Sequence, residues 1–150
     1  MKKEKVDKLL KDRDIRIKEK NPAEARAFLQ LARNSVKVVG NIALSDESST
    51  LIFREVYEAL RQLGDVLWLL EGYEAQRHEA SIEILKDLEI KDKVKLNFLD
   101  RYKKIRHDAN YRGIAVSVEI TKEIIDFWDV CSPEIIEQIE TKLKEKPKPL

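Results

Sequence analysis

Apolar residues recur every three to four positions along most of the chain, a spacing typical of amphipathic helices. Between them lie short polar segments that contain Ser, Asn, Gly or Pro, the residues that start and stop helices. The pattern predicts helices at about 21–40, 50–71, 78–88, 91–111 and 118–130, and a last helix that begins at 132–134. Residues 3–20 are highly charged with a thin apolar seam, which predicts either a late-docking helix or a partly frayed arm.

Local signals at the helix ends support these boundaries. Asn and Ser cap helix N-termini, and proline fits the first turn. We therefore expect helices to begin at Asn21-Pro22, at Ser117 and at Ser132-Pro133. Two glycines, Gly72 and Gly113, are expected to end helices. Another glycine, Gly64, falls inside the longest helix, where it predicts a close crossing with a neighbouring helix.

The predicted fold is an all-α, five- to six-helix up-down bundle. The chain has 150 residues, of which 38% are charged and only four are glycine and four proline, a composition that suits long helices rather than many short strands. The expected organisation is a charged N-terminal helix or arm at 1–20, one bundle domain at 21–146 and a disordered tail at 147–150.

Composition narrows the possible functions. A net charge of +1 excludes a globally basic nucleic-acid binder, so any such binding requires a local patch. Cys131 is the only cysteine, His78 and His107 are the only histidines, and no Gly-rich phosphate loop is present, so we expect no metal site and no cofactor. A single cysteine cannot form an intramolecular disulfide, so the expected location is cytoplasmic. No apolar stretch approaches the length of a membrane span.

Candidate chemistry is concentrated in residues 101–113, which hold five Lys or Arg and one Asp. On a helical wheel, Val94, Phe98, Tyr102, Ile105 and Ala109 face the core. We expect the other side to bind phosphate or RNA, through fixed cations and polar groups supplied by Arg101, Lys103, Lys104, Asp108, Asn110 and Arg112. The candidate catalytic residues are Arg106, His107 and Tyr111.

Simpler interpretations of these residues are also open. The basic segment is also compatible with a solvated helix face, although Arg, His, Asn and Tyr stand where Lys and Glu dominate other exposed faces. We expect His78 to be a surface or capping residue and Cys131 to be a buried thiol. Both tryptophans, Trp68 and Trp128, are expected in the core or at a dimer interface.

The string Arg106-His-Asp-Ala-Asn-Tyr111, followed by Arg112-Gly113, resembles the signature helix of HEPN domains, one branch of which carries Arg-x-x-Ala-Asp-Tyr. The resemblance extends over about residues 22–130. It includes an alanine-rich early helix, a long central helix ending at Gly72 with His78 six residues later, and the Ser117-Val-Glu119 start. HEPN domains are small all-α proteins, usually dimers, and many are ribonucleases or partners of nucleotidyltransferases.

The match departs from the catalytic HEPN pattern, which is Arg, a polar residue, three further residues and then His. Counted from Arg106, the final position holds Tyr111. Counted from Arg101, His107 falls at a looser spacing, but the polar position then holds Tyr102, which the wheel places in the core.

For an active member, the resemblance implies metal-independent RNA cleavage, in which the ribose 2′-hydroxyl attacks the adjacent phosphate and leaves a cyclic phosphate. His107 is then the general acid and base, Arg106 holds the phosphate, Asn110 or Asp108 orients them, and Tyr111 stacks or donates a hydrogen bond. One convex helix makes a poor pocket, so a homodimer is expected to form the cleft. The implied partner is a nucleotidyltransferase that acts as antitoxin to an endoribonuclease toxin.

Two alternatives to this function are a non-catalytic interaction module that binds a protein or nucleotide, and a structural bundle without a ligand.

Overall fold

The computed structural model of the protein describes residues 1–145, and the predicted tail at 147–150 lies outside this range. The described chain is mostly helical, which confirms the all-α class in its broad form. Its elements are α1 (Lys3–Lys11), β1 (Ile15–Ile17), α2 (Pro22–Val39), α3 (Ser49–Leu70), β2 (Tyr73–Ala75), α4 (His78–Lys86), the 3-10 helix η1 (Lys93–Asn97), α5 (Phe98–Arg112) and α6 (Val118–Lys144).

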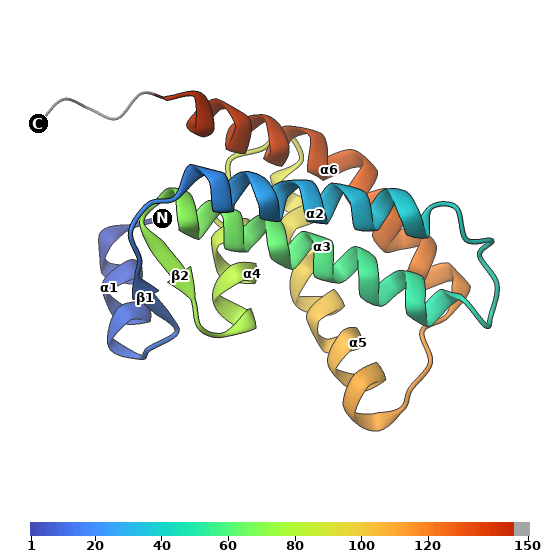
Figure 1. Ribbon diagram of the computed structural model, residues 1–150. Helices are drawn as coiled ribbons and strands as arrows, with labels where there is room; N and C mark the ends of the chain where they lie inside the picture. Colours follow the sequence, from blue (N-terminus) through green and yellow to red (C-terminus); the bar gives the residue numbers. More distant parts are fainter. Residues whose placement is uncertain (146–150) are drawn as a thin grey trace, which may run out of the picture.

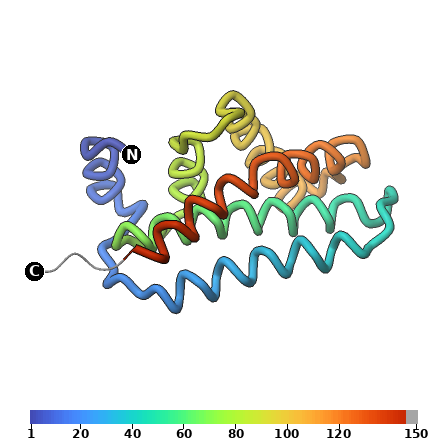
Figure 2. The backbone as a smooth tube through the Cα atoms, turned by 90° about the horizontal axis from the view of Figure 1, so that it is seen from above, coloured from blue at the N-terminus to red at the C-terminus, as the bar shows by residue number. Residues whose placement is uncertain are grey.

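Three long helices, α2, α3 and α6, lie side by side in both views of the backbone (Figures 1 and 2). The shorter α4 and α5 pack on α3 from below in Figure 1, and α1 lies with β1 and β2 at one end. As the apolar pattern predicts, α3 is the central element, and thirteen of its 22 residues are buried. Trp68 and Trp128 both belong to this core. No helix within residues 1–145 combines the length and the apolar character that crossing a membrane requires.

Two of the predicted helix starts and one predicted helix end are confirmed by the hydrogen bonds and backbone angles found there. The side chain of Asn21 accepts a hydrogen bond from the Glu24 backbone N–H at 3.2 Å, and Ser117 accepts one from the Ile120 N–H at 3.2 Å. At the end of α5, Gly113 adopts φ 65°, a left-handed conformation that glycine reaches without steric cost.

The close helix crossing predicted at Gly64 is also confirmed. A Cβ atom at this position would lie 2.2 Å from the carbonyl oxygen of Ser81, on α4. Real Cβ atoms do not approach an oxygen so closely, so only glycine lets α3 and α4 pack at this distance. A hydrogen bond from the Ser81 hydroxyl to the Asp65 carboxylate links the two helices at the crossing.

The helix expected through residues 3–20 ends at Lys11, and the all-α prediction therefore misses a small sheet. Arg13 has φ 60°, which stops the helix, and β1 then pairs antiparallel with β2, with Ile15 opposite Ala75. Ile15 is buried whereas Ile17 is 77% exposed. The partner strand lies almost sixty residues away, so no local pattern could indicate the pairing.

The two predicted C-terminal helices are a single helix, α6, and Pro133 lies inside it. The start signal at Ser132-Pro133 is therefore wrong. Buried residues continue at helical spacing through the proline, from Phe127 to Cys131, Ile135 and Ile139. Burial of this continuous stripe outweighs the lost backbone hydrogen bond, which in a helix interior costs about 3 kcal/mol.

The helix predicted at 91–111 begins only at Phe98, after the 3-10 turn of η1. Val94 and Phe98, both expected in the core, are 75% and 42% exposed, and Leu96 and Leu99 are buried instead. The helical wheel fails here because the change from 3-10 to α geometry shifts the angular position of residues 91–97.

Candidate functional site

Helix α5 is fixed in its rotation by its apolar face. Leu99 and Tyr102 are buried, and Ile105 and Ala109 pack against the core. The Tyr102 ring meets Phe127 of α6 and Phe53 of α3 edge-on, with ring centroids 5.6 and 6.1 Å away. These contacts determine which polar residues of α5 face α3, which face α6 and which face solvent.

One flank of α5 forms an open groove with α3. The groove has a volume of about 420 Å³ and is lined by Leu51, Arg54, Glu55, Glu58, Arg106 and Asn110. Arg54 donates a hydrogen bond from Nη1 to Oδ1 of Asn110 at 3.3 Å, which links the two helices across it. Within one chain, α3 therefore supplies a second wall beside Arg106, and the dimer that the sequence predicts stays a prediction.

Arg106 is half-buried in this groove and has no carboxylate within ion-pair distance among residues 1–145. Beneath it, the phenol of Tyr57 is buried. Burial raises the pKa of Tyr57 to about 12, although the nearby charges of Arg106 and Arg61 lower it. The phenol is neutral near pH 7 and does not form an ion pair with Arg106.

Arg61, next to Tyr57, is already neutralised. Its Nη1 donates to Asp65 Oδ2 at 2.9 Å, and its Nε donates to Glu58 Oε2 at 3.0 Å. The Glu58 carboxylate thus lines the groove but is committed to Arg61. Burial raises the pKa of Asp65, while the Ser81 hydrogen bond and the Arg61 charge lower it.

Two of the predicted phosphate ligands are paired within the chain. The Arg101 guanidinium forms an ion pair with Glu123 of α6, and Arg112 Nε lies 3.8 Å from Asp108 Oδ1. Arg101 was expected to keep its guanidinium available, and this expectation is wrong. The acid that pairs it comes from another helix, so counting charges in residues 101–113 could not reveal it.

The motif count that starts from Arg101 also fails. It requires Tyr102 as the polar residue, but Tyr102 is 1% exposed, and burial raises its pKa. Only the count from Arg106 leaves its residues accessible.

His107 and Tyr111 lie on the outer face of α5 and do not line the groove. Their ring centroids are 4.8 Å apart at an interplanar angle of 45°, and the Tyr111 side chain is 71% exposed. Lys103 is half-buried and Lys104 is exposed, and neither has a carboxylate within ion-pair distance in the described chain. His78 is exposed at the start of α4, as expected, and is not part of the groove.

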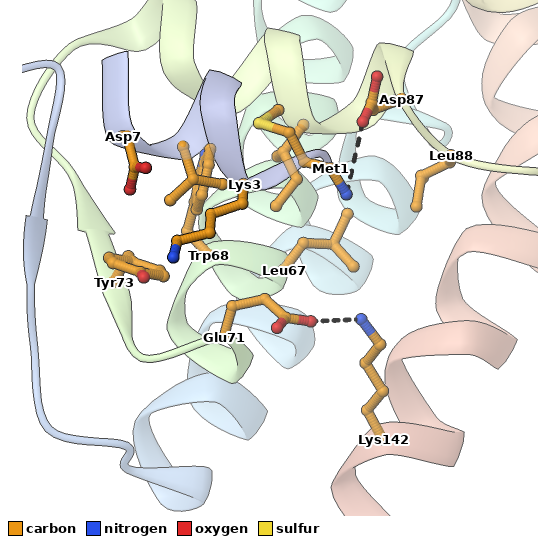
Figure 3. A pocket seen from close by; sticks show the side chains of 12 residues that line it. Met1, Lys3, Asp7, Leu67, Trp68, Glu71, Tyr73, Asp87, Leu88 and Lys142 are labelled. Atoms are coloured by element: carbon orange, nitrogen blue, oxygen red, sulfur yellow. Dashed lines mark hydrogen bonds and ion pairs between the residues drawn. The ribbon is translucent and has the colours of Figure 1, made fainter. Parts of the chain in front are cut away.

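A second cavity of about 350 Å³ lies under α1, at the other end of the molecule (Figure 3). Its floor includes Leu67 and Trp68, and an ion pair between Lys142 Nζ and Glu71 Oε1 at 2.7 Å lies at its edge. None of its lining residues belongs to α5. It is therefore separate from the predicted site.

Within residues 1–145, no three His, Cys, Asp or Glu side chains are grouped so that they could hold a metal ion. Comparison of the chain with protein-family models, with curated proteins and with solved structures gives no match. The resemblance to HEPN domains stays a prediction from the sequence.

Proposed function

We propose that this protein binds RNA or nucleotide phosphates in the groove between α3 and α5. The observation that carries the proposal is Arg106, a half-buried guanidinium that lines the groove with no carboxylate partner in residues 1–145. Such a group gains most from an anion that accepts two parallel hydrogen bonds, as a phosphate does. Lys103, one helical turn before Arg106, extends the positive surface along the same flank of α5.

Cleavage is the second part of the proposal, and it requires two copies of the chain. His107 follows Arg106 directly but points about 100° further around the helix, away from the groove. A twofold pairing of α5 helices would bring the His107 of a second copy toward the phosphate bound by Arg106. Exposed apolar side chains at the C-terminal end of α5, Tyr111 and Ile114, support such a contact.

In this dimer, the ribose 2′-oxygen attacks the phosphorus while His107 takes its proton, and the bond to the 5′-oxygen breaks as that oxygen regains a proton. Arg106 stabilises the charge that grows on the phosphate oxygens. The protein is then an endoribonuclease toxin, and a small nucleotidyltransferase is the partner that the HEPN resemblance implies as its antitoxin.

Binding is tested by fluorescence anisotropy with a short single-stranded RNA at low ionic strength. We expect Arg106→Ala to weaken binding about tenfold, the effect of losing one charge-assisted hydrogen bond. Arg101→Ala is the matched control, because its guanidinium is held by Glu123, and it should change the affinity less than about twofold. Undetectable binding of both RNA and ATP to the wild type would contradict the proposal and favour a structural bundle.

Cleavage is tested separately, by incubating total RNA with the protein in EDTA. We expect the wild type to produce cyclic phosphate ends and both Arg106→Ala and His107→Ala to be inactive. If the wild type binds RNA but does not cleave it, the proposal of catalysis is wrong and the proposal of RNA binding stands.

An interaction module is the second candidate, and one observation favours it. A second groove, lined by Asn34, Ser35, Val38, Val39, Leu51 and Glu55, adjoins the first, and its exposed lining is mostly apolar. Val38 is 63% exposed and Leu51 is 46% exposed, as a protein-binding surface would require. This candidate would be supported if a protein that co-purifies with the wild type no longer co-purifies with Val38→Asp while RNA binding is unchanged.

A further inference from the structure

We infer that α3 supplies the RNA-selective half of the site, with Arg54 as a second phosphate ligand and Glu55 as the acceptor for a ribose 2′-hydroxyl. The inference rests on the proposed function and specifies it further, because it assigns two residues outside the basic segment and predicts that the groove prefers RNA to DNA.

Arg54 is placed to share a phosphate with Arg106. Both side chains line the same groove, one from each helix, and Arg54 is tied to Asn110 by the 3.3 Å hydrogen bond across it. Arg54 also has no carboxylate within ion-pair distance among residues 1–145. The bond to a neutral amide leaves the guanidinium charge and most of its five donors available to a phosphate.

Glu55 determines what a ligand of the groove must offer besides a phosphate. Of the two glutamates that line the groove, Glu58 is paired with Arg61, whereas Glu55 has no ion-pair partner in the described chain. An ionised carboxylate only accepts hydrogen bonds, so a ligand must bring a donor to it. A phosphate alone would be repelled.

A ribonucleotide satisfies both requirements at once. Its phosphate suits the two arginines, and the 2′-hydroxyl of the sugar on the 5′-oxygen side of that phosphate, which is not the attacking hydroxyl, can donate to the carboxylate. A deoxyribonucleotide offers the phosphate but leaves Glu55 facing negative charge without a donor. The mixed charge of the groove, two arginines and two glutamates, therefore favours RNA over other polyanions.

The test compares a short single-stranded RNA with a DNA of the same sequence that carries deoxyuridine for thymidine, so that only the 2′-hydroxyl differs. We expect the wild-type chain to bind RNA about tenfold more tightly, the size of one hydrogen bond to a charged group. In Glu55→Ala the ratio should fall to about one, partly because DNA binds more tightly once the repelling charge is gone. A misfolded variant could not produce that gain.

Two further variants separate the roles. Arg54→Ala should weaken RNA and DNA binding by the same factor, because it removes a phosphate contact. Glu137→Ala, an exposed glutamate on α6, is the matched control and should leave both affinities unchanged.

Equal affinity of the wild type for RNA and DNA would overturn this inference and leave the proposed function standing. A preference for RNA that persists unchanged in Glu55→Ala would overturn the role of Glu55. Absence of binding to either nucleic acid would overturn both the inference and the proposed function.

Discussion

Arg101 and Arg106 are the same residue type on the same helix, yet they lie in different electrostatic environments. Arg101 faces α6 and pairs with Glu123, whereas Arg106 faces α3, above the neutral phenol of Tyr57. The sequence predicts both cations but cannot show which is paired, because the pairing acid lies on another helix. Of the residues predicted for the site, Arg106 and Asn110 line the groove, whereas Arg101 is paired outside it.

Cys131 provides a pH-dependent prediction at the residue scale. Burial raises the pKa of its thiol from 9.0 to about 11, so between these pH values the folded chain keeps a proton that the unfolded chain releases. The free energy of unfolding should then fall as the pH rises from 9 to 11. We expect a smaller fall in Cys131→Ala, measured by denaturant unfolding at both pH values.

The buried Tyr57 and Tyr102 titrate in both proteins, so they cancel in this comparison. Identical pH dependence of wild type and Cys131→Ala would contradict the assignment. The same burial predicts that a thiol reagent at pH 8 modifies the wild type only after unfolding.

Among the secondary-structure elements, the sequence correctly predicts the features that depend on neighbouring residues, namely helix caps and helix ends. The caps at Asn21 and Ser117 and the end of α5 at Gly113 are found as expected. The pairing of β1 with β2 and the groove between α3 and α5 were missed, because their partners lie far apart in the chain. Pro133 was misread because continuous burial overrides a local start signal.

Gly64→Ala tests the crossing of α3 and α4. The added Cβ would collide with the Ser81 carbonyl at 2.2 Å, so we expect a loss of about 1–3 kcal/mol, typical of overpacking. Gly40→Ala is the matched control, because its nearest atoms are carbonyl oxygens at 3.3 Å and its φ is −63°. Thermal unfolding that shows no loss of stability in Gly64→Ala would contradict the tight crossing.

Pro133→Ala tests the continuity of α6. In one continuous helix, alanine restores a backbone N–H that can bond the carbonyl of Asp129, so we expect a gain of about 1–2 kcal/mol in the free energy of unfolding. If Pro133 instead began a separate helix, its removal would lower the stability or leave it unchanged. Urea denaturation of the two proteins distinguishes the outcomes.

For the whole molecule, RNA binding and RNA cleavage have different structural requirements. The groove between α3 and α5 belongs to one chain, whereas His107 lies outside it and would reach a bound phosphate only from a second copy. We therefore expect RNA binding to persist in dilute, monomeric protein and cleavage to require dimerisation.

Mixing two inactive variants tests this arrangement. Heterodimers of Arg106→Ala with His107→Ala contain one site with both residues intact, so mixing should restore roughly a quarter of the wild-type cleavage if chains pair at random. Each variant alone should be inactive. Failure of the mixture to recover activity, with both variants folded and dimeric, would contradict a site shared between two copies.

We propose that Arg106 binds an RNA phosphate in the groove between α3 and α5. The most direct test is the salt dependence of RNA affinity for the wild type and Arg106→Ala. Each phosphate contact on a single strand contributes a slope of about −0.7 in log K against log salt, so the Arg106→Ala slope should be shallower by about that amount. A variant that binds with the same affinity and the same slope as the wild type would contradict the claim.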